Sequence, residues 1–420
     1  MKSENRYRVR PIFTWSCIRR RPVKESFFIL ARIIGSSIPN WMRKELIPRK
    51  WWFGSGDILG SFNGEFPIAG MMIESLEAPP LEERLLVSSL IPGFQAMKLR
   101  QNYVSSPYLP GADWKKLLDS QWSSVILNLN NLDVTATFLR NFFRNQGLSG
   151  FWGFDKMYQL FSLLNGSSSI GRARLMQEQF EVWRNEFPET LVKELDAPQI
   201  GNPWGYVVED SLLYEPVFEY HYQANYFHKL LSSISSPVII EIGGGFGGLA
   251  YQIIKKIPKV KYIGFDLPEN IFLQSYYLKC AFPEANILTY HEGISSVTRD
   301  DLDSFDIILL PNFMLPQVEL GLADLIVNIR SLSEMPFETI QEYLHQVDRL
   351  GPTFFFHENI YKRRLDEFHG IPSSEFPSLQ NLSLVAQSES RWPKYQKESG
   401  YPCRENLFIH NDRMHQKTSK

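Results

Sequence analysis

The sequence has few cysteines, no internal repeat and no long uninterrupted apolar run. Cys17, Cys280 and Cys403 lie far apart, without the spacing of a metal site or a redox pair. This indicates a reducing compartment, no disulfide framework and no metal cluster. The apolar stretch at 26–42 is broken by an arginine, a glycine and a proline, and it is shorter than the roughly 20 residues that a spanning helix needs. We expect neither a signal peptide nor a membrane span.

The chain also lacks an excess of charge of one sign, since its formal net charge is −2. We therefore expect no nucleic-acid partner. The charge is unevenly distributed, because residues 1–50 carry about +10 and the remainder about −12. Two interpretations of this basic arm stay open. It folds onto the acidic body, or it contacts anionic lipid, which would place a cytoplasmic protein at the inner face of the membrane.

A change of pattern along the 420 residues predicts two domains behind the arm. Nine of the ten tryptophans lie at or before Trp204, and residues 172–187 have helical periodicity. After residue 236, short apolar strands alternate with helical segments, which is typical of a mostly parallel sheet covered on both faces. We predict a basic arm at 1–50, a mainly helical accessory or substrate domain at 51–235 and a doubly wound, Rossmann-like α/β domain at 236–415.

The elements of the last domain follow from the same pattern. We predict strands at 237–242, 260–266, 305–312, 324–329 and 353–359, helices at 248–257, 268–282 and 336–350, and a closing antiparallel pair at 381–390 and 405–410.

The stretch VIIEIGGGFGGLAYQII (238–254) joins the first of these strands to a helix through a loop with five glycines. In such sheets, ligands bind beyond the carboxyl ends of the strands. Glycines at that place allow positive φ and a close approach of the backbone to a ligand. Gly243, Gly245 and Gly248 also fit the Gly-x-Gly-x-x-Gly pattern of dinucleotide folds, so the loop by itself leaves the ligand open.

Glu241 favours S-adenosylmethionine as the ligand. A carboxylate two residues before the first glycine would repel a pyrophosphate, whereas the ammonium and sulfonium groups of S-adenosylmethionine are positive. Asp266, at the end of the second strand, suits ribose hydroxyls, although a dinucleotide fold would use an acid there too. The predicted cofactor-binding residues are Glu241, Gly243, Gly245, Gly247, Asp266 and Leu267.

Six stretches carry a resemblance to a known family, and the motifs at 265–278 and 326–344 are more specific than the glycine loop. The six stretches are IGNPWGY (200–206), EYHYQANYF (219–227), EIGGGFGGLA (241–250), FDLPENIFLQSYYL (265–278), IVNIRSLSEMPFETIQEYL (326–344) and FFFHENIYKR (354–363). They resemble the sugar O-methyltransferases of bacterial surface-polysaccharide gene clusters, over about half of the chain. The resemblance implies an S-adenosylmethionine-dependent O-methyltransferase that methylates a hydroxyl of a sugar or surface glycan.

Polar residues after two predicted strands are candidates for the acceptor site. Asn328, Ser331 and Asn359 are predicted to bind the substrate. Glu334 is the first candidate base, but an anchor for a sugar hydroxyl and the mere start of a helix stay open as interpretations. His357 is the second candidate base, at a place where the sequence departs from the family, and a structural histidine is the alternative.

Two other functions stay open. One is a non-catalytic, methyltransferase-like binding module in a glycan-biosynthesis complex. The other is a methyltransferase that acts on another small molecule. The intact glycine loop, Asp266 and the polar residues after the strands favour an enzyme.

Overall fold

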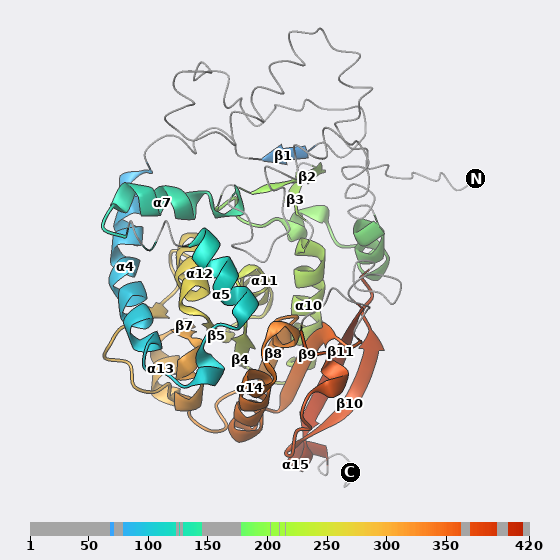
Figure 1. The fold of residues 1–420 in the computed structure, drawn as a ribbon. Helices are drawn as coiled ribbons and strands as arrows, with labels where there is room; N and C mark the ends of the chain where they lie inside the picture. The colour runs from blue at the N-terminus through green and yellow to red at the C-terminus, as the bar shows by residue number, and fades with distance from the viewer. Residues whose placement is uncertain are drawn as a thin grey trace, which may run out of the picture. The chain divides into compact units, whose positions relative to one another are not determined.

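The computed structural model describes residues 68–70, 79–122, 126, 129–144, 178–201, 203–209, 211–214, 216–362, 370–392 and 402–414 (Figure 1). The predicted basic arm at 1–50 lies outside the described residues. The chain divides into two compact units, one made of residues 1–80 and 133–219 and the other of residues 81–132 and 220–420. The three-part division predicted above stays a prediction, since its first boundary falls outside the described residues.

The second unit is built on one eight-stranded sheet. Its strands are β4 (Val238–Ile242), β5 (Lys261–Asp266), β6 (Ile287–Thr289), β7 (Ile307–Pro311), β8 (Leu325–Ile329), β9 (Phe354–Ile360), β10 (Leu382–Glu389) and β11 (Cys403–His410). They lie in the order β10-β11-β9-β8-β4-β5-β7-β6. Strands β4 to β9 pair in parallel, and β9, β11 and β10 pair antiparallel. The predicted strands and the closing antiparallel pair are confirmed, and the short edge strand β6 is an addition to them.

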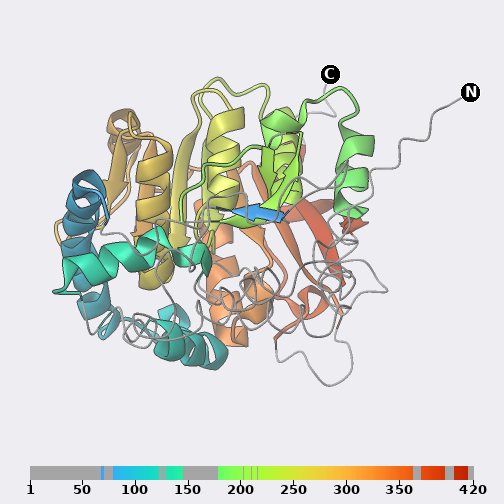
Figure 2. The ribbon, with the colours of Figure 1, turned by 90° about the horizontal axis from the view of Figure 1, so that it is seen from above.

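Helices cover both faces of this sheet. They are α11 (Gly248–Lys256), α12 (Pro268–Ala281), α13 (Arg299–Ser304) and α14 (Phe337–Leu350), with a four-residue α15 (Asn411–Met414) after the last strand. Figure 2 shows α11 (yellow) on one side of the sheet and α14 (orange) on the other. Because the strands after β4 are added first on one side of it and then on the other, a switch in strand order lies between β4 and β8. The predicted doubly wound, Rossmann-like α/β fold is confirmed.

Local sequence signals explain where these elements begin and end. All five residues of β4 and of β7 are buried, as expected for strands covered on both faces. Pro268 occupies the first turn of α12 with Glu269 beside it, where a missing N–H costs nothing and a negative charge meets the helix dipole. Gly351 ends α14 in the left-handed conformation, with φ of 58°.

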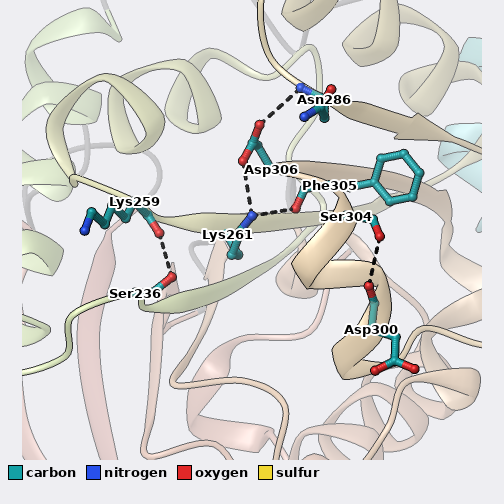
Figure 3. A network of polar contacts seen from close by, with 8 residues as sticks. All are labelled: Ser236, Lys259, Lys261, Asn286, Asp300, Ser304, Phe305 and Asp306. Atoms are coloured by element: carbon teal, nitrogen blue, oxygen red, sulfur yellow. Dashed lines mark hydrogen bonds and ion pairs between the residues drawn. The ribbon is translucent and has the colours of Figure 1, made fainter.

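At the amino edge of the sheet, polar side chains join the loops that precede the strands (Figure 3). Lys261, which opens β5, donates to the carboxylate of Asp306 at 3.1 Å and to the carbonyl of Phe305 at 3.0 Å. The N–H of Asn286 donates to the same carboxylate at 3.1 Å. Lys261 and Asp306 keep contact with solvent, so this ion pair adds little stability and serves mainly to align the starts of three strands.

Helix α4 (Leu81–Gln101) belongs to the same unit as the sheet and packs against α12. Phe94 stacks on Phe272 with ring centroids 4.7 Å apart, and Lys98 forms an ion pair of 2.7 Å with the buried carboxylate of Glu269. Because α12 has the sheet on one side and α4 on the other, its residues from Pro268 to Leu278 are all buried. Residues 81–132 therefore help to enclose the domain that holds the glycine loop.

The first unit contains helix and a small sheet. Strands β1 (Ile68–Gly70), β2 (Trp204–Val208) and β3 (Ser211–Leu213) pair antiparallel in that order. Helix α7 (Leu132–Arg140) lies almost wholly in this unit, and residues 178–186 form another helix within the predicted helical stretch. Phe180 and Trp183 of that helix are buried. Helix α10 (Val217–Leu230) links the two units in sequence.

Among the described helices, none has the length and the apolar character that crossing a bilayer requires.

Candidate active site

The glycine loop between β4 and α11 has the backbone conformation that its sequence predicts. Gly243, Gly245 and Gly247 have φ angles of 77°, 58° and 96°. Residues other than glycine rarely adopt positive φ angles. These three positions therefore favour glycine whatever surrounds them. The N–H of Gly243 donates to the carbonyl of Phe265 at 2.7 Å, which ties the loop to the end of β5.

Three of the loop glycines also leave room for protein side chains. A Cβ on Gly243 would lie 2.1 Å from Oγ of Ser331. On Gly247 it would lie 3.0 Å from Cγ of Gln274, and on Gly244 it would lie 2.8 Å from Nε2 of the same glutamine. The bare backbone thus serves the packing of the loop as well as any approach to a ligand.

Asp266 lies at the carboxyl end of β5, directly beside the loop. Its Oδ2 accepts the N–H of Gly245 at 2.8 Å, while Oδ1 accepts the N–H of Leu267 at 2.7 Å and the amide of Asn270 at 2.9 Å. Burial raises the pKa of Asp266 to about 6, and these three donors oppose the rise. A carboxylate accepts about four hydrogen bonds, so one further donor fits Oδ2 as the side chain now lies.

Glu241 lies behind the loop and is 2% exposed. Its Oε2 accepts the hydroxyl of Tyr262 at 2.5 Å, and Nε2 of Gln274 donates to that hydroxyl at 3.3 Å. Burial raises the pKa of Glu241 to about 7, the hydrogen bond from Tyr262 opposes the rise, and the charge of Asp266 adds to it. The sequence singled out Glu241 but not Tyr262 or Gln274, because their roles depend on β5 and α12 lying next to β4.

Two buried carboxyl groups therefore lie next to the glycine loop, Asp266 beside it and Glu241 behind it, and they act on each other. Such an arrangement suits a positively charged ligand and opposes a pyrophosphate. These residues fit S-adenosylmethionine, with Asp266 able to accept a ribose hydroxyl and Glu241 acting through its charge. Leu267 contributes its backbone N–H to Asp266 and opens α12.

The predicted substrate-binding residues hydrogen-bond to one another. The amide of Asn328 donates to the carbonyl of Ile242 at 2.9 Å and to Oγ of Ser331 at 2.5 Å. Its oxygen accepts the amide of Asn359 at 2.8 Å. Asn328 and Asn359 are fully buried. In the described structure they fasten the turn after β8 to the end of β4 and to β9, and their contact with a substrate stays a prediction.

A buried ion pair fixes the same turn from the other face of β9. Arg330 has a left-handed φ of 62°, and its guanidinium donates to Glu358 at 3.0 Å. Gln223 of α10 donates to the other oxygen of Glu358 at 3.3 Å. Burial raises the pKa of Glu358, while Arg330 lowers it. Together with Asn328 and Asn359, this ion pair fixes the turn that positions Glu334.

Glu334 ends the short 3-10 helix Leu332–Glu334, and its side chain is exposed to solvent. Its Oε2 accepts the indole N–H of Trp114 at 3.1 Å. Although the residue is exposed, protein atoms crowd its carboxyl group, and this partial desolvation raises the pKa of Glu334. Trp114 and Arg330 lower it, and the charge of Asp266 raises it, so Glu334 lies within electrostatic reach of the cofactor end of the sheet.

His357 occupies a different environment. It is 5% exposed and lies among the rings of Phe355, Phe376 and Phe408, with centroids 5.4 to 5.8 Å away. Its Nδ1 is 3.4 Å from the amide of Asn359. Burial lowers the pKa of His357 to about 3, so the ring is neutral and a poor proton acceptor. Of the two candidate bases, Glu334 has the better surroundings for accepting a proton.

Within the described residues, no group of three or more histidine, cysteine or acidic side chains has the geometry of a metal site.

A family model matches part of the sheet domain. Residues 225–330 match the O-methyltransferase domain. The matched segment runs from α10 through the glycine loop to the turn after β8, and thus contains Glu241, Asp266 and Asn328. The match confirms the predicted O-methyltransferase domain and its cofactor, S-adenosylmethionine. The sugar acceptor implied by the resemblance is a finer statement that this match does not contain.

Solved structures that are similar to part of the chain include methyltransferases. A small RNA methyltransferase, HEN1, is 13% identical with a TM-score of 0.33, over 47% of this chain and 26% of that one. The N-methyltransferase NodS from Bradyrhizobium japonicum is 14% identical with a TM-score of 0.31, over 46% of this chain and 86% of that one. A mitomycin 7-O-methyltransferase is 12% identical with a TM-score of 0.29, over 57% and 70%. At such low identities and TM-scores, these structures say nothing of the acceptor. No curated protein matches the chain.

Proposed function

We propose that this methyltransferase transfers a methyl group to a hydroxyl of a sugar or surface glycan. The observation that carries the proposal is the Glu334 carboxylate, exposed at the carboxyl edge of the sheet, with a raised pKa and within electrostatic reach of Asp266. The family-like stretches around residues 200–206 and 326–344 support a sugar as the acceptor.

In this proposal the bound cofactor supplies an activated methyl group. An alcohol hydroxyl is a weak nucleophile, so a protein group has to take its proton as the oxygen attacks. Glu334 accepts that proton, because desolvation of its carboxyl group raises its pKa and makes it a stronger base than an ordinary surface glutamate. The turn held by Asn328, Asn359 and the Arg330–Glu358 pair keeps the carboxylate in place, and such positioning accounts for much of the rate of a transfer reaction.

The proposal is tested with isotopically labelled S-adenosylmethionine and an extract of bacterial surface polysaccharide. We expect label in the glycan with the wild-type protein, and a loss of roughly 10²- to 10⁴-fold with Glu334→Gln, the usual range for a general base. The matched control is Glu338→Gln, an exposed glutamate in the first turn of α14. Cofactor binding is measured in each variant.

Two results would contradict the proposal. Cofactor binding without transfer to any glycan or small hydroxyl compound would indicate the non-catalytic module. Transfer to small hydroxyl compounds but never to a sugar would indicate the other small-molecule function. Near-normal transfer by Glu334→Gln would leave the enzyme class intact but remove Glu334 as the base.

A further inference from the structure

Residues 106–114, which the sequence left without a role, are anchored at the carboxyl edge of the sheet. The hydroxyl of Tyr108 donates to Glu342 of α14 at 2.7 Å. The carbonyl of Tyr108 accepts the amide of Asn312, which follows β7, at 3.0 Å. Gly111 then passes close to Pro336, since a Cβ there would lie 3.1 Å from the proline Cδ. Two hydrogen bonds and one close contact thus fix the start of helix α5 (Ala112–Gln121).

Trp114 lies in the first turn of that helix, and its indole N–H points to Oε2 of Glu334 at 3.1 Å. An indole N–H only donates, so it can hydrogen-bond to the carboxylate but offers no acceptor to a protonated acid. A rigid aromatic donor therefore favours one orientation and the ionised state of an otherwise exposed side chain. The charge of Arg330 also lowers the pKa of Glu334, whereas the charge of Asp266 raises it.

We propose that Trp114 is a positioning residue for the methyl transfer, holding the Glu334 carboxylate ionised and oriented toward the acceptor. The inference rests on the proposed function for its catalytic meaning, but the contact itself is testable without an acceptor. It also gives residues 106–114 a role, because their anchors on α14 and after β7 determine where the indole lies.

The direct test follows the indole N–H signals of the 15N-tryptophan-labelled protein by NMR from about pH 4 to about pH 9, with S-adenosylhomocysteine as the bound probe. The Trp114 signal is identified by its loss in Trp114→Phe. We expect its shift to titrate with a midpoint above that of an ordinary glutamate, and the titration to disappear in Glu334→Gln. A Trp114 signal that does not titrate, or that titrates equally in Glu334→Gln, would overturn the inference.

The functional test compares the pH dependence of kcat, with the surface-polysaccharide extract as acceptor. Trp114→Phe keeps an aromatic ring but removes the donor, so the pKa of Glu334 rises and the acid limb of the profile moves to higher pH by roughly half a unit to one unit. At a fixed pH on the acid side of the limb, kcat falls about 3- to 10-fold and the KM for the cofactor is unchanged. In a Glu334→Gln background the same substitution has no further effect on the profile.

The matched control is Trp122→Phe, the same substitution at the end of the same helix, where the ring packs against Phe94 and Phe272. We expect it to leave the acid limb in place. If Glu334→Gln abolishes transfer while Trp114→Phe leaves the limb unshifted, the positioning role is wrong and the proposed function stands. If Glu334→Gln keeps normal transfer, the assigned base is wrong, and the NMR titration still decides whether the contact exists.

Discussion

Replacing Glu241 by glutamine tests whether the fold carries an unfavourable charge at the cofactor site. Glu241 is almost completely buried. Its carboxylate accepts the hydroxyl of Tyr262, and that hydroxyl in turn accepts the amide of Gln274. Glutamine has nearly the same shape, and its carbonyl oxygen can accept the hydroxyl of Tyr262 as the carboxylate does. The substitution therefore removes the charge while it keeps the packing and the hydrogen bond.

The sign and size of the effect follow from the pKa. The carboxyl group has an ordinary pKa of 4.5 when unfolded and about 7 when folded. The folded protein holds this proton over a range in which the unfolded chain has lost it, so wild-type stability falls as the pH rises from about 4.5 to about 7. Each pH unit corresponds to about 1.4 kcal/mol, so the full penalty above pH 7 is on the order of 3 kcal/mol. Glutamine has no such penalty.

Urea unfolding of the two proteins at pH 5 and at pH 8 measures the difference. We expect Glu241→Gln to gain about 2–3 kcal/mol relative to the wild type between these two pH values. Asp266 is present in both proteins, so its own titration largely cancels. The control is Glu284→Gln at an exposed glutamate, for which we expect no pH-dependent gain. A stability difference between Glu241→Gln and wild type that stays constant with pH would refute the reasoning.

Three further predictions concern the site. Asp266→Ala should weaken S-adenosylmethionine binding by about 1.5–3 kcal/mol in calorimetry, because a charge-assisted hydrogen bond to the cofactor is lost, and unchanged affinity would remove Asp266 from the site. In single-turnover assays, His357→Asn should keep near-normal transfer where Glu334→Gln does not, since the ring is enclosed and neutral; a large loss only in the histidine variant would reverse the assignment. Gly243→Ala should cost about 2–5 kcal/mol of stability from left-handed strain and the clash with Ser331, and adding Ser331→Gly should recover only the part due to the clash.

The sheet was predictable because each strand and helix carries its own signal. β4 and β7 are continuous apolar runs, and α12 begins at a proline followed by an acid. β6 was missed because a three-residue, half-buried edge strand has too little periodicity to stand out. The place of α4 was also not predictable. No element was predicted there from the sequence, and the contacts of Phe94 and Lys98 with α12 depend on tertiary packing.

The candidate site was predictable in position and less so in roles. Parallel strands bring their carboxyl ends to one edge, so residues after β4, β5 and β8 had to meet there. Whether a polar side chain at that edge faces a ligand or another protein group depends on neighbours distant in sequence. Asn328 and Asn359 were predicted to bind substrate, and the structure pairs them with each other. Trp114 had no local signal at all, since it lies 220 positions from its partner Glu334.

The carboxyl edge contains two kinds of polar group, which differ in whether they stabilise the fold. Asn359 donates to Asn328, and the two side chains also bond to Ile242, Ser331 and Ser333, so they stabilise the turn that they form. Glu241 instead places an ionisable carboxyl group where burial opposes its charged form. A neutral glutamine would serve the fold better above pH 7, so stability does not explain this glutamate. A ligand that brings positive charge to the glycine loop does, because its field favours the ionised form. Stability and cofactor affinity should therefore change in opposite directions in Glu241→Gln at pH 8.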